Sequence, residues 1–153
     1  CEMAAYEKSK GKSLYDKLLE LYVQYGCYQE HLISITKKGR DGQQQIADMM
    51  ERFRNNPPQT LAGIKVAQLL DYEKRQKTLL ADGKTEPIQL PKSNVLQFVL
   101  DDGSKISARP SGTEPKIKFY FSVKAPLNNA ADYDKVQQEL KAKIETIIKE
   151  MNL

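Results

Sequence analysis

The sequence is poor in the residues that build metal and redox sites. Its 153 residues include a single histidine, His31, and two cysteines, Cys1 and Cys27. Metal sites and redox pairs need several such residues at short, regular spacing, and that spacing is missing here. We therefore predict two reduced thiols of a cytoplasmic protein and no metal site in this chain. A nucleophile pair of Cys27 and His31 is the weaker alternative, because a lone histidine on a strand is usually structural.

Long apolar runs and a strong charge of one sign are also missing. No segment approaches the roughly 20 apolar residues that span a bilayer, and no basic and then apolar leader begins the chain. The sequence therefore predicts a soluble protein without a membrane partner. The 24 basic and 20 acidic residues give a net charge of +4 and are scattered. This charge predicts a mild preference for anions and does not favour nucleic acid.

Apolar residues recur at helical spacing in three parts of the chain. Ser13 precedes the first part and can form a capping box with Asp16, while Gly26 follows it. Asp41 precedes the second part as a predicted cap, and residues 55–58, Asn-Asn-Pro-Pro, end it. The apolar stripes are Leu14, Leu18, Leu21, Tyr22 and Tyr25; Ile46, Met49, Met50 and Phe53; and, after Ala130, Tyr133, Val136, Leu140, Ile144, Ile147 and Met151.

Alternating apolar and polar residues predict the strands. We expect a short edge strand at 28–37, a strand at 64–71, a hairpin of 96–100 and 105–109, and a strand at 117–124. The polar stretch 73–91, with Gly83, Pro87 and Pro91, predicts a long connection. Hairpin-linked strands with helices from distant parts of the chain predict an α+β fold, with a largely antiparallel sheet and helices packed on one face.

The loop between the last two predicted strands has the composition of a phosphate site. It reads Arg-Pro-Ser-Gly-Thr-Glu-Pro-Lys from Arg109 to Lys116. Arg109 offers a planar fork of donors, Ser111 and Thr113 offer hydroxyls, and Lys116 adds a positive charge. Gly112 lets the backbone N–H groups approach an anion closely. The sequence therefore predicts a loop that grips a phosphate group.

The remaining loop residues support this prediction or leave it open. The two prolines fix the backbone at both ends, so less entropy is lost when a ligand binds. Glu114 would repel a phosphate unless it points away or orients Arg109 or Lys116. The alternative is an ordinary glycine and proline loop whose basic side chains are merely solvated.

The run RPSGTEPK, entered from a strand and left into KIKFYFSV, resembles the phosphate-binding loop of the α-D-phosphohexomutases, the phosphoglucomutase and phosphomannomutase family. Residues 1–26 resemble, more loosely, the helix that ends the third domain of these four-domain enzymes and the link into the fourth. The resemblance implies that residues 27–153 form the C-terminal domain, of the TATA-binding-protein-like type. The continuation KIKFYF is more similar to phosphoglucomutases, while a preference for mannose remains open.

The resemblance also implies a role for this chain within a longer enzyme. Arg109, Ser111, Gly112 and Thr113, helped by Lys116, would hold the phosphate that is not transferred while a hexose 1-phosphate and 6-phosphate interconvert. The phosphoserine loop, the aspartate-rich loop for Mg²⁺ and the sugar-recognition loop of the family have no counterpart here, so this fragment has no catalytic residues of its own. Its implied partners are the hexose phosphate of glucose or mannose and the other domains of the same chain.

A second hypothesis from a different class is a free-standing anion-binding or nucleic-acid interaction module. Lys105, Lys118, Tyr120 and Lys124 would share a basic face of the sheet on the predicted alternation. Basic grooves with aromatic side chains bind single strands, but one aromatic among lysines is more often a solvated face.

Overall fold

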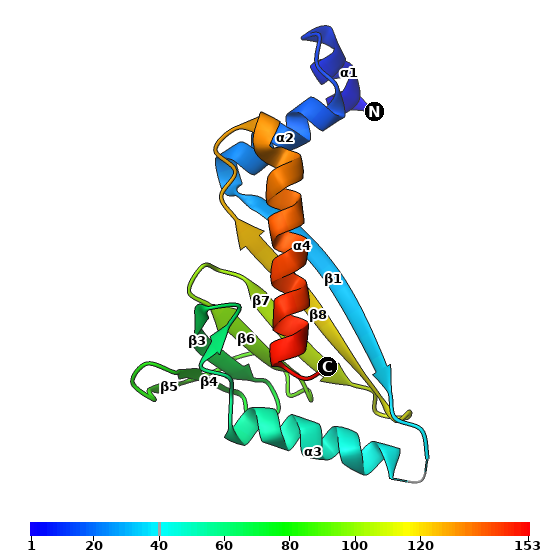
Figure 1. The fold of residues 1–153 in the computed structure, drawn as a ribbon, viewed down its shortest axis with the longest axis vertical. Coiled ribbons are helices and arrows are strands. Elements are labelled where there is room, and N and C mark those ends of the chain that lie inside the picture. Colours follow the sequence, from blue (N-terminus) through cyan, green and yellow to red (C-terminus); the bar gives the residue numbers. More distant parts are fainter. Residues whose placement is uncertain (40) are drawn as a thin grey trace.

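Helices cover one face of an antiparallel sheet in the computed structural model, which describes residues 1–39 and 41–153 (Figure 1). The strands are β1 (Cys27–Thr36), β2 (Thr60–Leu61), β3 (Ile64–Asp71), β4 (Gln76–Leu79), β5 (Thr85–Pro87), β6 (Leu96–Leu100), β7 (Lys105–Pro110) and β8 (Lys116–Ala125). The helices are α1 (Glu2–Ser9), α2 (Leu14–Tyr25), α3 (Gly42–Asn55), the 3-10 turn η1 (Ala130–Asp132) and α4 (Tyr133–Glu150). The predicted α+β fold is confirmed.

The strands lie in the order β1-β8-β7-β6-β3-β4-β5, and β2 pairs with β3. Every pairing between the described strands is antiparallel. Helix α4 runs along β1 and β8, whereas α3 crosses the far end of the sheet near the β7–β8 loop (Figure 1). The predicted hairpin and final strand are therefore neighbours in the middle of the structure.

The core lies between the sheet and helices α3 and α4. Strand β8 alternates as predicted, and its inward side chains are fully buried: Ile117, Phe119, Phe121 and Val123. The Phe53 ring of α3 packs edge-on against Phe98 of β6, with ring centroids 5.8 Å apart, and against Phe119 at 6.1 Å. Leu140, Ile144 and Ile147 of α4 complete the cluster.

Two of the predicted helices begin in different ways, one with a side-chain cap and one without. The Ser13 hydroxyl accepts the Asp16 N–H at 3.1 Å and the Asp16 carboxylate accepts the Ser13 N–H at 2.8 Å, so the predicted capping box is confirmed. Helix α3 begins directly after Asp41, but the Asp41 side chain makes no capping bond within the described residues. The prediction of a side-chain cap there was wrong, and the Gly42 N–H instead donates to the Gly39 carbonyl at 3.3 Å.

The prediction of a long connection over 73–91 was also wrong. Strands β4 and β5 form a hairpin there at the edge of the sheet, with Thr78 opposite Thr85 and Gln76 opposite Pro87. The turn is closed by the Leu79 N–H, which donates to the Lys84 carbonyl at 2.8 Å, and by Gly83 at a φ of +70°. Polar, half-exposed edge strands carry little apolar alternation, and Pro87 is acceptable at an edge.

Strand β1 is an edge strand as predicted, but it pairs with β8 along its whole length.

A buried arginine fastens α3 to the sheet. The side chain of Arg54 is 6% exposed, and its Nε lies 3.2 Å from the carboxylate of Asp71, whose side chain is 7% exposed. The same guanidinium donates to Glu73 at 2.5 Å, to Asn94 at 2.6 Å and to Glu51 at 2.9 Å. The bonds to Asp71, Glu73 and Asn94 thus connect α3 to the end of β3, to the turn after it and to the segment before β6, while the bond to Glu51 stays within α3.

We predict that Arg54→Ala lowers the free energy of unfolding by about 3 kcal/mol, because it leaves the buried Asp71 carboxylate without its counter-charge. Urea denaturation measures this change. Arg52→Ala, an equal change at an exposed position of the same helix, should cost less than about 1 kcal/mol. Equal losses for the two variants would contradict the assignment.

A second polar cluster joins the β6–β7 turn to α4. The Lys143 ammonium bonds the Asp102 carboxylate and donates to the fully buried Ser104 hydroxyl at 2.8 Å. Burial acts to raise the pKa of Asp102, but the bond from Lys143, the Ser104 N–H and the positive charge lower it below its usual value. A carboxyl whose pKa is lowered in the folded state stabilises the fold at pH values above its pKa in the unfolded chain, which is about 3.9. This contribution is lost as the pH falls through its pKa in the folded state.

We therefore predict that Lys143→Met lowers the free energy of unfolding at pH 7 by about 1 kcal/mol, because Asp102 is partly exposed and its ion pair is partly screened. The difference from the unchanged chain should shrink as the pH falls from about 4 through the lowered pKa of the folded Asp102 carboxyl. Denaturation at both pH values checks this, with exposed Lys141→Met as the control. A difference that stays constant with pH would contradict it.

Two remaining sequence-based expectations concern the membrane and the thiols. None of the helices in the described part of the chain combines the length and the apolar character needed to cross a bilayer. Cys1 is exposed and Cys27 is buried, and both are free thiols. The Cys27 sulfur accepts a hydrogen bond from Gln137 at 3.1 Å, which places this thiol in the core.

Candidate functional site

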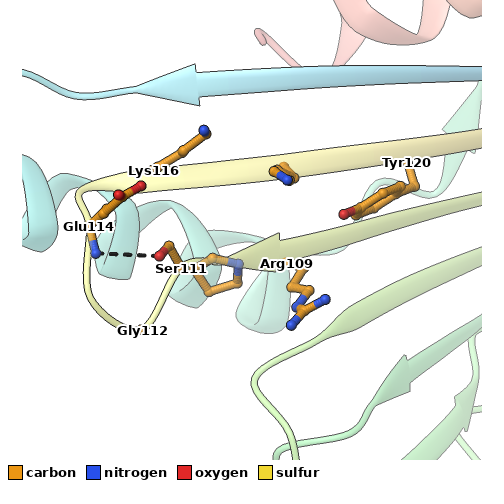
Figure 2. Close-up of a pocket in the computed structure, with 8 residues that line it drawn as sticks. Arg109, Ser111, Gly112, Glu114, Lys116 and Tyr120 are labelled. Carbon is orange, nitrogen blue, oxygen red and sulfur yellow. Dashed lines mark hydrogen bonds between the residues drawn. The ribbon is translucent and has the colours of Figure 1, made fainter.

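The loop between β7 and β8 borders a hollow of about 270 Å³ on the surface. Figure 2 shows the side chains around it, which come from the end of β7, the loop and the first half of β8. The lining residues are Arg109, Pro110, Ser111, Gly112, Glu114, Lys116, Lys118 and Tyr120. Four of the five predicted phosphate contacts are therefore brought together, and Thr113 is the one that does not line the hollow.

The loop is closed by its own hydrogen bonds. The Ser111 N–H donates to the Lys116 carbonyl at 2.8 Å, which extends the β7–β8 ladder by one step. The Ser111 hydroxyl accepts the N–H of Glu114 at 3.3 Å, drawn as a dashed line in Figure 2, and that of Thr113 at 3.4 Å. Because these bonds use only the acceptor side of the hydroxyl, its proton stays available for a ligand.

Three positive charges surround the hollow. Arg109 lies directly opposite Lys118 in the β7–β8 register, and Lys116 begins β8 on the same face. Within residues 1–39 and 41–153, no carboxylate lies within ion-pair distance of any of the three. Like charges that face each other across a strand pair are destabilising. An anion bound between Arg109 and Lys118 would remove that repulsion.

The orientation of Glu114 answers the question that its sequence position raised. Its carboxylate lies on the Lys116 side of the loop and points away from Arg109 (Figure 2). The negative charge therefore does not oppose an anion next to the guanidinium. Thr113 is exposed at the tip of the loop, and its N–H is directed to Ser111.

The loop rests on the beginning of helix α3. The Lys37 N–H donates to the Pro115 carbonyl at 2.9 Å, directly beyond the last residue pair of β1 and β8. Gly42 is buried, and a Cβ there would lie 2.3 Å from the Lys37 carbonyl oxygen and 3.1 Å from Pro115 Cβ. Gly42 is therefore needed for the close contact between α3 and the loop. No local sequence pattern indicates this contact, since it joins residues far apart in the chain.

Lys118 and Tyr120 belong to the hollow, although sequence reasoning placed them only on a general basic face. The alternation along β8 was a usable signal, because it puts 116, 118 and 120 on one side of the strand. What was missing was the register, which sets Arg109 opposite Lys118 and Ser107 opposite Tyr120.

The other candidates are not brought together into a site. Cys27 and His31 lie on the same strand, about 13 Å apart by their spacing of four residues, too far for a nucleophile and its base. Met50 is buried in the core and Met49 packs against it, as the helical spacing predicted. Among the described residues, no group of three or more histidine, cysteine or acidic side chains is placed to hold a metal ion.

We predict that Gly112→Ala separates ligand binding from stability. The backbone at Gly112 is not in the left-handed region, and an added Cβ meets no described atom within 4 Å. Unfolding free energy should stay the same or rise by up to about 1 kcal/mol, while affinity for inorganic phosphate should fall about tenfold, because the methyl group occupies ligand space. Calorimetric titration and urea denaturation measure the two quantities.

Gly83→Ala serves as the opposite control. Gly83 lies outside the hollow at a φ of +70°, so alanine should cost about 1 kcal/mol of stability and leave phosphate affinity unchanged. Unchanged phosphate affinity in Gly112→Ala would show that the loop backbone does not approach the ligand.

Comparison with known proteins identifies relatives of one kind. No family model matches the sequence. The phosphoglucomutase of Staphylococcus haemolyticus (strain JCSC1435) is 39% identical over 133 residues, which are 87% of this chain and 23% of that protein. The phosphoglucomutase of Staphylococcus aureus (strain MRSA252) is 42% identical over 137 residues, or 90% of this chain and 24% of that protein.

Among solved structures, the phosphoglucomutase pp63/parafusin from Paramecium, in its open form, aligns with 96% of this chain and 25% of its own. The TM-score is 0.49 and the sequence identity is 18%. The chain thus spans about a quarter of the length of the curated relatives that it matches. The sequence matches confirm the predicted resemblance to phosphoglucomutases, and the matched residues correspond to one part of those longer proteins.

Proposed function

We propose that the loop from Arg109 to Lys116 binds the phosphate group that is not being transferred on a hexose phosphate. The observation that carries this proposal is the placement of Arg109 opposite Lys118, with Lys116 and the Ser111 hydroxyl at the same hollow. Arginine can bind two phosphate oxygens at once, and the lysines add positive charge without competing acceptors. The hydrogen bonds within the loop hold its backbone in place before a ligand binds, and this reduces the conformational entropy lost on binding.

We further propose that this binding serves a phosphoglucomutase that interconverts the 1-phosphate and 6-phosphate of a hexose. Phosphoryl transfer is catalysed mainly by positioning and by stabilisation of charge. A loop that fixes the distal phosphate supplies binding energy away from the reacting centre, and this energy raises turnover if it is realised in the transition state. The chain's own residues would bind and orient, while the phosphoryl group moves elsewhere in the longer protein.

A Mg²⁺ ion, if the whole enzyme uses one, would be held by other parts of the protein. The described residues offer no cluster of three metal-binding side chains, so their donor set does not fit such a site. The basic lining of the hollow suits an anion instead of a cation. We therefore assign no metal chemistry to this chain.

Residues 1–26 form the connection to the preceding part of that enzyme in this proposal, and residues 27–153 form the phosphate-binding domain. Helices α1 and α2 extend away from the sheet (Figure 1). Helix α2 is amphipathic but buries none of its residues, and its apolar side chains Leu14, Leu18 and Leu21 are exposed. An exposed apolar helix face of this kind suits contact with other domains of the same protein.

Arg109→Ala is the direct test of the proposed function. We expect inorganic phosphate and glucose 6-phosphate to lose about tenfold or more in affinity for this chain, from a charge-assisted contact of about 1.5–3 kcal/mol. In a full-length mutase that contains the chain, kcat/KM should fall by a similar factor. Isothermal titration and steady-state kinetics measure the two effects.

Lys105→Ala is the matched control, because it removes one positive charge from the same strand at a position outside the hollow. It should change affinity by less than about twofold, as expected for screened long-range charge. Equal losses in the two variants would favour a diffuse basic surface, such as the nucleic-acid hypothesis requires. Unchanged phosphate binding in Arg109→Ala would overturn the proposed function.

A further inference from the structure

Tyr120 has an unusual position for a large aromatic side chain. It is 38% exposed, although it lies in the middle of the ten-residue strand β8 and lines the hollow next to the phosphate loop. Within the described part of the chain, its hydroxyl makes no hydrogen bond and its ring contacts no other aromatic ring and no cation. Exposing part of an aromatic ring to water costs free energy that packing elsewhere would avoid.

The residues around Tyr120 form two rows across the open face of the sheet. The first row holds the charges, with Lys118 between Arg109 and Ser34. The second row carries no charge, with Tyr120 between Ser107 and the exposed Leu32. Residues two apart on a strand are separated by about 7 Å. The second row therefore lies about one sugar ring's length from the charges.

The orientation of the Tyr120 side chain also places it at the space beside the charges. In Figure 2 the Tyr120 ring lies along β8 with its hydroxyl directed toward the loop, on the same side of the strand as Arg109. The hollow of about 270 Å³ equals the share of about nine water molecules in liquid water, which is more than a phosphate group fills. The space beside the charges is thus bounded by an aromatic ring with a free hydroxyl.

We infer that Tyr120 contacts the sugar ring of the hexose phosphate whose phosphate lies between Arg109 and Lys118, an inference that rests on the proposed function. A hexose has an apolar C–H face and polar edges. The Tyr120 ring covers the apolar face, and its hydroxyl bonds a sugar hydroxyl near the phosphate. Leu32 and the Ser107 hydroxyl, which also accepts a bond from Gln97 at 3.0 Å, extend the surface on both sides. Tyr120 acts as a specificity-determining residue, because a phosphate held between Arg109 and Lys118 lies one row away from the ring and only the attached sugar extends to it.

The test compares two ligands on three forms of the chain. Isothermal titration measures the affinity of inorganic phosphate and of glucose 6-phosphate for the unchanged chain, Tyr120→Ala and Tyr28→Ala. Tyr28 is the matched control, since it is 40% exposed on the same face of the sheet but lies opposite Lys124, outside the hollow. We expect Tyr120→Ala to weaken glucose 6-phosphate about fivefold, or about 1 kcal/mol, and to leave inorganic phosphate unchanged. Tyr28→Ala should change neither.

A further variant and two contrary outcomes complete the test. Tyr120→Phe keeps the ring and should retain most of the affinity that depends on the sugar. If substitution at this position instead disrupted the fold, Tyr120→Phe would lose that affinity as well. If the chain binds both ligands and Tyr120→Ala weakens both equally or neither, the inference about Tyr120 is wrong while the phosphate site stands. If the unchanged chain binds neither ligand at millimolar concentration, the proposed function fails and this inference fails with it.

Discussion

The antiparallel pairing of β7 with β8 is the constraint on which both the core and the site depend. Side chains alternate across a strand, so a single register decides which residues of β8 are buried and which face the solvent. The inward set, Ile117, Phe119, Phe121 and Val123, packs against α3 and α4. The outward set begins with Lys116 and Lys118 and meets Arg109 across the strand pair. A slip of one residue would bury the lysines and expose the phenylalanines, so core packing fixes the geometry of the site.

The loop that joins these strands is held in shape from two sides. Its own hydrogen bonds close it between Ser111 and Lys116, and the start of α3 packs against Pro115 through Gly42. Helix α3 is in turn fastened to β3 by the buried guanidinium of Arg54. The free energy of these distant contacts therefore contributes to the order of the loop, and a preorganised loop loses less entropy when it binds an anion.

Much of this arrangement was predictable from local patterns. The capping box at Ser13, the alternation along β8 and the eight-residue loop are all short-range features, and the structure bears out the first two. The loop was found because donors, a glycine and two prolines coincide within it, and its role stays a proposal. The resemblance to phosphohexomutases also depended on it, and the comparisons confirm that resemblance.

The misses have physical causes of other kinds. Strands β4 and β5 are short and polar, with β4 half-exposed and β5 exposed, so their pairing is decided by backbone hydrogen bonds that leave no apolar pattern. Aspartate is typical of helix caps, which is why Asp41 was predicted as one, but the Gly42 N–H donates to the backbone carbonyl of Gly39 instead. The membership of Lys118 and Tyr120 in the hollow depends on strand register, and the support from Gly42 depends on a contact across more than 70 positions of the chain. Neither can be deduced from a local window.

The central claim is that the loop from Arg109 to Lys116 holds a phosphate group, and an NMR amide titration of this chain tests it most directly. Inorganic phosphate, glucose 1-phosphate and glucose 6-phosphate should each shift the amides of Ser111, Gly112 and Thr113 in a saturable way that weakens with added salt. The chemical shifts of amides in β7 and β8 beyond the hollow should not change. Shifts spread evenly over the basic sheet face around Lys105 and Lys124, or none in the loop at millimolar ligand, would contradict the account.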